Sequence, residues 1–375
     1  MYKPIIAIAL LALVLSCTKK HQPTREESIL GNWVEVKVFQ VTAHPYTGRP
    51  FKYVKPGFTF YKDNTFENNL GYFRDDTVLN RQFYLGNLGK FKIKGDSLTL
   101  TSADGSYEDK YWLLTLNADT LKIEQDSVVT IFKHYEKKIS KTPPFDKIIL
   151  SSSGCYGTCP AINMMIDANG NVLFGGMMYT THNGWYTGKI TTALYNRLQD
   201  NFRQVDFDTL KTAYHAGWTD DQTICMTFVK DNKIYKSVLD YGCQAPCFFI
   251  WARTPLEYLY QTIKLSKAAK TGSIPEFTVL RKVNSKITDS IIRLMYSEQF
   301  LLTDYLHHGK KVTPAAFKPK FKLTDDFYTK TPINTDGRYY TFTLNGKQET
   351  IDLGFNFFDV NNKTLTWQKP DTYGD

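Results

Sequence analysis

The sequence predicts a multidomain, β-rich chain in which an antiparallel β-barrel is followed by α+β domains. Three observations predict this fold class. The chain has 375 residues, more than one hydrophobic core usually organises, so two or three domains are expected. Aromatic residues make up 15% of the chain. Because such residues suit the half-buried faces of β-sheets, the enrichment indicates β-structure in the first place, and a ligand-binding surface is the second interpretation. Short alternating runs broken by turn residues fill the first third of the chain.

The overall composition is that of a folded globular protein. The formal net charge is +9, and the lysines and arginines are scattered instead of forming one run. A basic balance affects association with anionic surfaces and does not determine the fold. The N-terminal leader described next predicts export from the cytoplasm, and an exported chain would not meet nucleic acid. We therefore expect lipid head groups and acidic glycans as the anionic surfaces, and no nucleic-acid partner.

Residues 1–16 are interpreted as a signal peptide. Lys3 supplies a positive charge, residues 5–15 contain no polar side chain, and Ser16 and Cys17 follow. An apolar run of this length spans about 16 Å as a helix, roughly half of a bilayer core. It therefore fits the apolar region of a signal peptide and is too short for a membrane span.

Val14-Leu15-Ser16-Cys17 resembles the lipobox of bacterial lipoproteins, although Leu15 is bulkier than the residue usual there. The resemblance implies cleavage before Cys17, a diacylated sulfur and an acylated new N-terminus, which together anchor a protein stably. A plain secreted protein cleaved elsewhere is the alternative. Residues 17–28 are interpreted as the lipidated cysteine and a flexible tether. The tether lacks the acidic run that resembles a surface-export signal in some Gram-negative lipoproteins. We therefore expect a bacterial cell-envelope protein on the periplasmic side of the outer membrane.

Residues 29–136 contain a series of hairpin signals. Apolar and polar residues alternate, and turn residues interrupt them at 62–65, 95–96 and 117–119. This spacing predicts a meander closed into a barrel or a sandwich. Gly31-Asn32-Trp33 resembles the Gly-x-Trp of lipocalins, which implies an eight-stranded lipocalin-like barrel with Trp33 plugging its floor and Lys133 capping that ring. Such a barrel is either filled by its own side chains or holds one small apolar ligand.

Residues 137–146 include two consecutive prolines and are interpreted as a linker. Residues 147–268 then alternate strand and helix patterns, with hairpins over 162–175 and 224–239 and helices over 191–202 and 255–264, so an α+β domain is expected. Cys155-Tyr-Gly-Thr-Cys159-Pro160, the Asn-Gly hairpin after it and Asp220 before a strand resemble an uncharacterised bacterial domain family marked by Cys-x-Gly-x-Cys-Pro. This resemblance implies no activity.

Residues 273–375 form a C-terminal α+β unit with a possible internal repeat. In the preceding domain, a helix is expected to begin at Lys189-Ile-Thr-Thr, and a later hairpin ends at 239–242. The C-terminal unit has a similar pattern, with Lys286-Ile-Thr-Asp followed by a hairpin that ends at 351–354. We hypothesise that this unit is a degenerate copy of half of the preceding domain, with a helix beginning at Lys286. Chance similarity of short hairpins is the alternative. His307 and His308 are interpreted as part of a solvated loop.

The cysteines after Cys17 form two Cys-x-x-x-Cys pairs, with Cys225 in a strand pattern as the expected buried thiol. Choosing four of the five allows fifteen connectivities. Structural disulfides, local or between the two turns, are the first interpretation for an exported chain and would stabilise it by about 2–4 kcal/mol. A zinc site of four thiolates and a redox-active pair are the alternatives. The disulfide candidates are Cys155, Cys159, Cys243 and Cys247.

No P-loop, Gly-x-Ser-x-Gly or His-Glu-x-x-His motif occurs in the sequence. Asp220 and Asp221 could be paired carboxylates or a cation site, or they could cap a turn before the strand at Thr223. The sequence thus predicts a non-enzymatic envelope lipoprotein, without metal or cofactor, that binds a small apolar or glycan ligand or an envelope protein. The alternative is a thiol-redox or hydrolytic enzyme that uses Cys155 and Cys159 with Asp220. The candidate binding residues are Trp33, Trp185, Tyr214, Trp218, Asp220 and Asp221.

Overall fold

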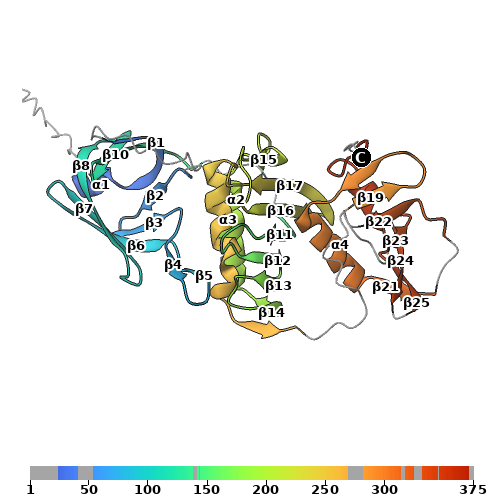
Figure 1. Ribbon diagram of the computed structural model, residues 1–375. Helices are drawn as coiled ribbons and strands as arrows, with labels where there is room; N and C mark the ends of the chain where they lie inside the picture. Colours follow the sequence, from blue (N-terminus) through green and yellow to red (C-terminus); the bar gives the residue numbers. More distant parts are fainter. Residues whose placement is uncertain are drawn as a thin grey trace, which may run out of the picture.

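The computed structural model describes residues 24–40, 54–137, 142, 144–268, 282–313, 317–324, 332–344 and 346–370. The predicted signal peptide, Cys17 and most of the predicted tether lie outside these residues. Three units follow one another along the molecule, with the barrel and the C-terminal unit at opposite ends (Figure 1). None of the helices in the described part of the chain combines the length and the hydropathy that a membrane crossing requires.

The predicted antiparallel barrel is confirmed. Eight strands close it in the order β1-β10-β9-β8-β7-β6-β3-β2. A helical turn, α1 (Arg25–Ser28), precedes them, so the tether ends earlier than predicted, and Arg25 donates to the carbonyl of Gly95 at 2.7 Å. The strands are β1 (Gly31–Gln40), β2 (Gly57–Phe60), β3 (Thr65–Asn68), β6 (Leu88–Lys94), β7 (Ser97–Ser102), β8 (Glu108–Leu116), β9 (Thr120–Gln125) and β10 (Val128–Tyr135).

Trp33 lies at the barrel floor, as predicted, but the residue that covers it was wrongly predicted. Its side chain is fully buried and its indole nitrogen donates to the carbonyl of Ile29 at 2.7 Å. His134, the cross-strand partner of Trp33, packs edge-on against the ring with centroids 5.2 Å apart. Lys133 points to the opposite face and donates to Thr120. A Cβ on Gly31 would collide with the His134 ring, which explains the glycine before this tryptophan.

Among the residues that the structure describes, thirteen buried hydrophobic side chains pack together in the barrel core. Phe60 packs against Phe58, Phe66 and Phe91 with ring centroids 5.0–5.8 Å apart. Of the two possibilities left open by the sequence, the structure therefore favours a barrel packed by its own side chains. A hairpin that the sequence analysis missed projects from the barrel toward the second unit, formed by β4 (Phe73–Asp76) and β5 (Arg81–Tyr84).

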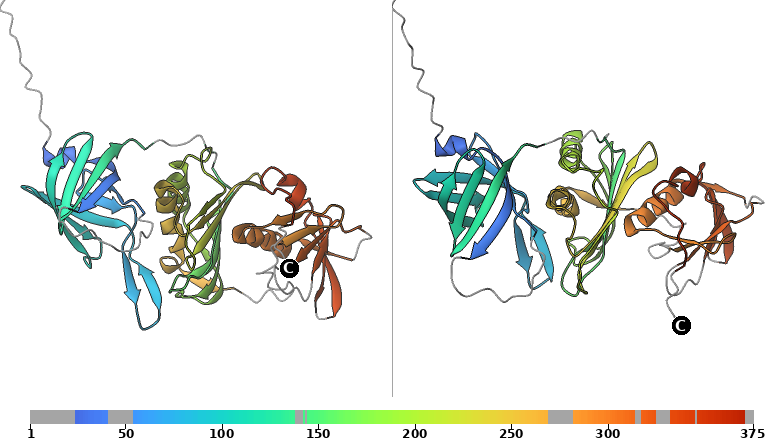
Figure 2. Two further views of the ribbon diagram at one scale, coloured as in Figure 1. Left: turned by 45° about the horizontal axis from the view of Figure 1, so that its top comes forward. Right: turned by 90° about the horizontal axis from the view of Figure 1, so that it is seen from above.

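The second unit is an eight-stranded sheet in the order β15-β17-β16-β11-β12-β13-β14-β18, with two helices on the face toward the barrel (Figures 1 and 2). The helices, α2 (Thr192–Arg203) and α3 (Cys247–Glu257), share a core with that face, and the short η1 (Leu259–Gln261) follows α3. The strands are β11 (Lys147–Ser152), β12 (Ala161–Asp167), β13 (Asn171–Met178), β14 (Gly184–Lys189), β15 (Ala213–His215), β16 (Thr223–Lys230), β17 (Lys233–Tyr241) and β18 (Leu265–Lys267).

Two boundaries of the second unit differ from the prediction. Phe145, assigned to the linker, is 1% exposed, and its main chain bonds to Gln199 and Tyr195 of α2. The closing helix begins at Cys247 and contains Pro255, whereas the sequence analysis started it at Pro255. The second cysteine pair therefore leads directly into a helix.

The C-terminal unit shares a core with the second unit. Its helix α4 (Tyr296–His308) packs on β11 and β16, on the face opposite α2 and α3, and against its own sheet, of order β20-β19-β22-β23-β24-β25-β21. Figure 2 shows α4 between the two sheets. The elements are β19 (Lys282–Ser285), β20 (Ile291–Arg293), β21 (Lys310–Val312), β22 (Phe321–Thr324), β23 (Ile333–Thr335), β24 (Tyr339–Leu344), β25 (Lys347–Asp352) and α5 (Phe357–Val360).

The predicted repeat is not found. Lys286 lies in a bend between β19 and β20, and the helix begins only at Tyr296. The strand after the helix also pairs differently in the two units, because β15 runs parallel to β17 whereas β21 runs antiparallel to β25. His307 and His308, interpreted as a solvated loop, form the last turn of α4.

Candidate functional site

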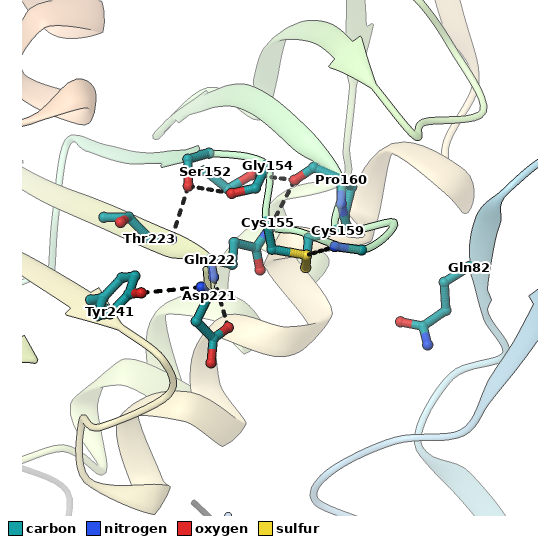
Figure 3. The surroundings of a disulfide bond; sticks show 12 residues. Gln82, Ser152, Gly154, Cys155, Cys159, Pro160, Asp221, Gln222, Thr223 and Tyr241 are labelled. Carbon is teal, nitrogen blue, oxygen red and sulfur yellow. Dashed lines mark hydrogen bonds between the residues drawn. A yellow bond between two sulfur atoms is a disulfide. The ribbon is translucent and has the colours of Figure 1, made fainter. Parts of the chain in front are cut away.

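The first cysteine pair forms a disulfide in a tight turn between β11 and β12. Cys155 and Cys159 are bonded, with their Cα atoms 5.6 Å apart. Neighbouring residues hold the turn by hydrogen bonds. Gln222 donates to the carbonyl of Pro160 at 2.9 Å (Figure 3). The amide of Tyr156 donates to the carbonyl of Asp220 at 3.0 Å. The predicted disulfide of the first pair is confirmed as a local bridge.

The second pair does not form the predicted bridge. Cys243 and Cys247 remain thiols, as does Cys225, which is buried in β16 as predicted. Cys243 has a left-handed backbone conformation, and its sulfur accepts a hydrogen bond from Arg253 at 3.4 Å. Burial raises the pKa of this thiol despite the guanidinium, so it is a poor nucleophile at neutral pH. Within the described residues, no three His, Cys, Asp or Glu side chains are grouped to hold a metal, so the four-thiolate alternative is not formed there.

The acidic pair serves as turn structure. Asp221 accepts from the amide of Gln222 at 2.7 Å and from the indole of Trp218 at 3.0 Å. Asp220, in a left-handed conformation, accepts from Thr219 through its carboxylate and meets the disulfide turn through its main-chain carbonyl. The hydroxyl of Tyr214 accepts from the amide of Lys211. These contacts match the turn-capping interpretation more closely than an acid–base pair.

A groove of about 1410 Å³ lies between the second sheet and α4. One wall is the sheet face that carries Met165, Leu173 and Trp185, and the other is α4 with Phe300 and Thr303. The disulfide turn borders one end, where Ser152, Ser153 and Gly154 line the groove, and the last turn of α4 borders the other. Ligand sites commonly have about 300–1,000 Å³, so this groove has room for an extended ligand.

The charges at the α4 end of the groove are paired. The Lys147 ammonium lies 2.8 Å from the Asp304 carboxylate, whose side chain is 8% exposed, and 5.0 Å from the ring centroid of Tyr305. His308 lies 3.3 Å from the same carboxylate. Burial lowers the pKa of His307, which favours the neutral form of this side chain. The groove therefore presents a mixed apolar and polar surface without a strong excess of either charge at this end.

Of the predicted binding residues, only Trp185 lines this groove. Trp33 lies in the barrel floor, and Tyr214, Trp218, Asp220 and Asp221 form the loop around β15. The α4 wall was missed because it depends on packing between units. The sequence does carry one signal for the α4 wall. Phe300, Leu301 and Leu302 are consecutive, so they point to different sides of the helix, and all three are buried. A helix that is apolar on several sides is usually enclosed by other parts of the protein.

Comparison with known families assigns the first two units. Residues 29–123 match the family model described as a lipocalin-like domain, and residues 146–260 match the one described as a domain of unknown function, DUF6438. The chain carries a lipocalin-like domain followed by a DUF6438 domain. The DUF6438 match holds the disulfide turn and the sheet wall of the groove, whereas the α4 wall lies beyond it.

The remaining comparisons add no functional relative. No curated protein matches the chain. Among solved structures, the crystal structure of a Helicobacter pylori beta clamp bound to a DNA ligase peptide is similar at 5% identity, covering 88% of this chain and 94% of that chain. Its TM-score of 0.16 carries no argument about fold or function.

Proposed function

We propose that this protein is a lipid-anchored lipoprotein of the bacterial cell envelope, facing the periplasm, that binds a ligand in the groove between the DUF6438 sheet and α4. The groove is the observation that carries the binding role, because its volume and its mixed apolar and polar walls are those of a ligand site. The packed barrel interior supports a scaffolding role for the lipocalin-like domain.

The N-terminal signal sequence supports the proposed localisation. The short apolar run that ends at Ser16-Cys17 is too short to span a bilayer and has the pattern of a cleaved, lipidated signal. Growth with an alkyne-tagged fatty acid should label the wild-type protein and leave Cys17→Ser unlabelled. A wild-type protein that carries no fatty acid, or that still begins at Met1, would contradict the anchoring.

Native mass spectrometry of the protein purified from its own membrane tests the binding role. A co-purified ligand should appear on the wild type and be lost in Thr303→Trp, which fills the groove from α4. Thr115→Trp, on the outer surface of the barrel, is the matched control and should keep the ligand. A ligand retained by Thr303→Trp would place binding outside the groove.

A further inference from the structure

The sheet wall of the groove carries an aromatic platform. A Cβ on Gly175 would lie within 2.6–2.8 Å of three ring atoms of Trp185, so the indole lies flat over this glycine on the groove face. Phe300 of α4 borders the ring, with centroids 5.6 Å apart. The tryptophan is half-buried and lines the groove, so part of its apolar surface remains available to a ligand.

Buried polar groups lie along the same groove without partners. Ser151 is 1% exposed and Gln299 is 5% exposed, and both line the groove. The Ser151 hydroxyl and the Gln299 amide nitrogen have no hydrogen-bond partner among the described residues, and the same holds for the Tyr305 hydroxyl. These three atoms have almost no accessible surface, so a ligand in the groove would meet the more accessible polar side chains of Asn163 and Thr187, which also line it.

Two other ligand classes fit less well. An acyl chain would cover the polar side chains of Asn163 and Thr187 and offer them no hydrogen bonds. An extended peptide binds through main-chain hydrogen bonds at a free sheet edge, but this wall is the face of β11–β14, whose main chains are paired in the ladder. The ligand must therefore be recognised by side chains.

We propose that the groove binds the sugar rings of a neutral oligosaccharide, with Trp185 as the stacking surface. A sugar ring combines an apolar C–H face, which suits an indole, with hydroxyl groups on its rim, which suit the accessible side chains of Asn163 and Thr187. A neutral ligand fits because the Lys147 and Asp304 charges neutralise each other. This inference rests on the proposed binding role and names the ligand class for it.

Calorimetric titration of the full-length protein with cellotetraose, chitotetraose and maltotetraose tests the proposal. At least one tetrasaccharide should bind, and Trp185→Ala and Asn163→Ala should each weaken that binding tenfold or more. Trp185→Phe keeps an aromatic surface and should retain most of the affinity. Trp112→Ala is the matched control, because Trp112 is 63% exposed on the outer surface of the barrel, and it should bind as the wild type does.

The outcomes separate this inference from the proposed function. If no tetrasaccharide binds, or if Trp185→Ala and Asn163→Ala both bind as the wild type does, the carbohydrate assignment is overturned. Palmitate that binds the wild type but not Thr303→Trp would then keep the groove as a ligand site of another class. If neither sugars nor palmitate bind and the purified protein carries no ligand, the binding role fails as well.

Discussion

Arg253 is 2% exposed and lies between two buried carboxylates near the barrel side of the second unit. Its guanidinium lies 3.2 Å from Asp240 and 3.2 Å from Glu257. Asp240 also accepts from the amides of Gln244 and Ala245 in the turn before α3. The arginine therefore holds together β17, the second cysteine turn and α3. Removing one member of such a group leaves the others charged and buried.

Arg253→Met should lower the free energy of unfolding by about 3–5 kcal/mol, because two carboxylates lose their buried counter-charge. Urea unfolding followed by circular dichroism measures this change. Arg338→Met is the control, because Arg338 pairs with Asp352 at a side-chain exposure of 45%, where ion pairs contribute about 1 kcal/mol or less. Equal losses in the two variants would contradict the structural role of Arg253.

The cysteines provide a second residue-scale prediction. Without reductant, alkylation of the unfolded protein should modify, among the cysteines that the structure describes, only Cys225, Cys243 and Cys247. Reduction should add Cys155 and Cys159. Peptide mass mapping reads both states. A bridge that contains Cys243 or Cys247 in the unreduced protein would contradict the pairing.

Helix α4 makes a polar contact with the second unit and carries a buried carboxyl group. Ser297 lies 2.8 Å from Thr227 of β16, and the Glu298 carboxylate accepts from the amide of Met295. Glu298 is 3% exposed, and burial raises its pKa from 4.5 to about 7. Its carboxyl group is therefore protonated in the folded protein at mildly acidic pH, where it would be ionised in the unfolded chain.

This shift predicts a pH dependence of stability. Because the folded state binds the proton more tightly, the stabilisation is complete below about pH 4.5 and is lost as the pH rises toward 7, by about 3 kcal/mol in all. Glu298→Gln should remove this contribution. Urea unfolding at pH 5 and pH 8 measures it, with the exposed Glu108→Gln as control. The same pH dependence in wild type and Glu298→Gln would contradict the assignment.

The β4–β5 hairpin joins the barrel to the second unit. Gln261 accepts from the amide of Tyr84 and donates to the carbonyl of Gln82, both at 2.8 Å. Tyr258 stacks on Tyr84 with ring centroids 5.6 Å apart and contacts Phe73. The hairpin thus holds the barrel against α3 and η1. Gln261 makes the two hydrogen bonds to the hairpin main chain in this contact.

Gln261→Ala should loosen this contact and let the barrel unfold separately, because the two main-chain groups of the hairpin lose their partners at a cost of about 1–3 kcal/mol. Differential scanning calorimetry should then resolve an additional transition, which the exposed Gln348→Ala should not produce. A calorimetric profile of Gln261→Ala identical to that of the wild type would count against the role of the hairpin.

The sequence predicts features set by local chemistry and misses those set by packing between units. The barrel hairpins follow from turn residues such as Gly95-Asp96, and the structure has them in place. The sequence assigns the cap of Trp33 to Lys133, whereas His134 is the cross-strand partner, because register is not visible in one strand and a shift of one residue reverses the face. In the candidate site, Trp185 was named from its aromatic loop, but Gln299 and Phe300 reach the groove only because α4 packs on another unit's sheet.

At the scale of the whole molecule, the second and third units depend on each other. Ile149, Met165, Val229 and Ile234 of the second sheet are buried in the same core as α4 and the third sheet. A domain boundary placed at residue 268 therefore cuts through one hydrophobic core. The barrel, in contrast, closes its own core and leaves no free sheet edge.

A fragment of residues 24–268 should accordingly self-associate, because it exposes the apolar face that α4 covers. The barrel fragment 24–137 should stay monomeric and folded, and it serves as the control. Light scattering coupled to size-exclusion chromatography compares them. A monomeric 24–268 fragment with native circular dichroism would contradict the shared core.

The capped turn α1 determines how far the molecule would stand from a bilayer. Thr24 caps this turn, and Arg25 ties it to Gly95 of the barrel. Cys17 is seven residues before Thr24, and seven extended residues reach at most about 25 Å. With an acylated Cys17, the barrel would stay close to the lipid head groups. The second sheet and α4 lie beyond the barrel along the molecule (Figure 1), so the groove between them would open into the aqueous space. It would then meet water-borne molecules before bilayer-embedded ones.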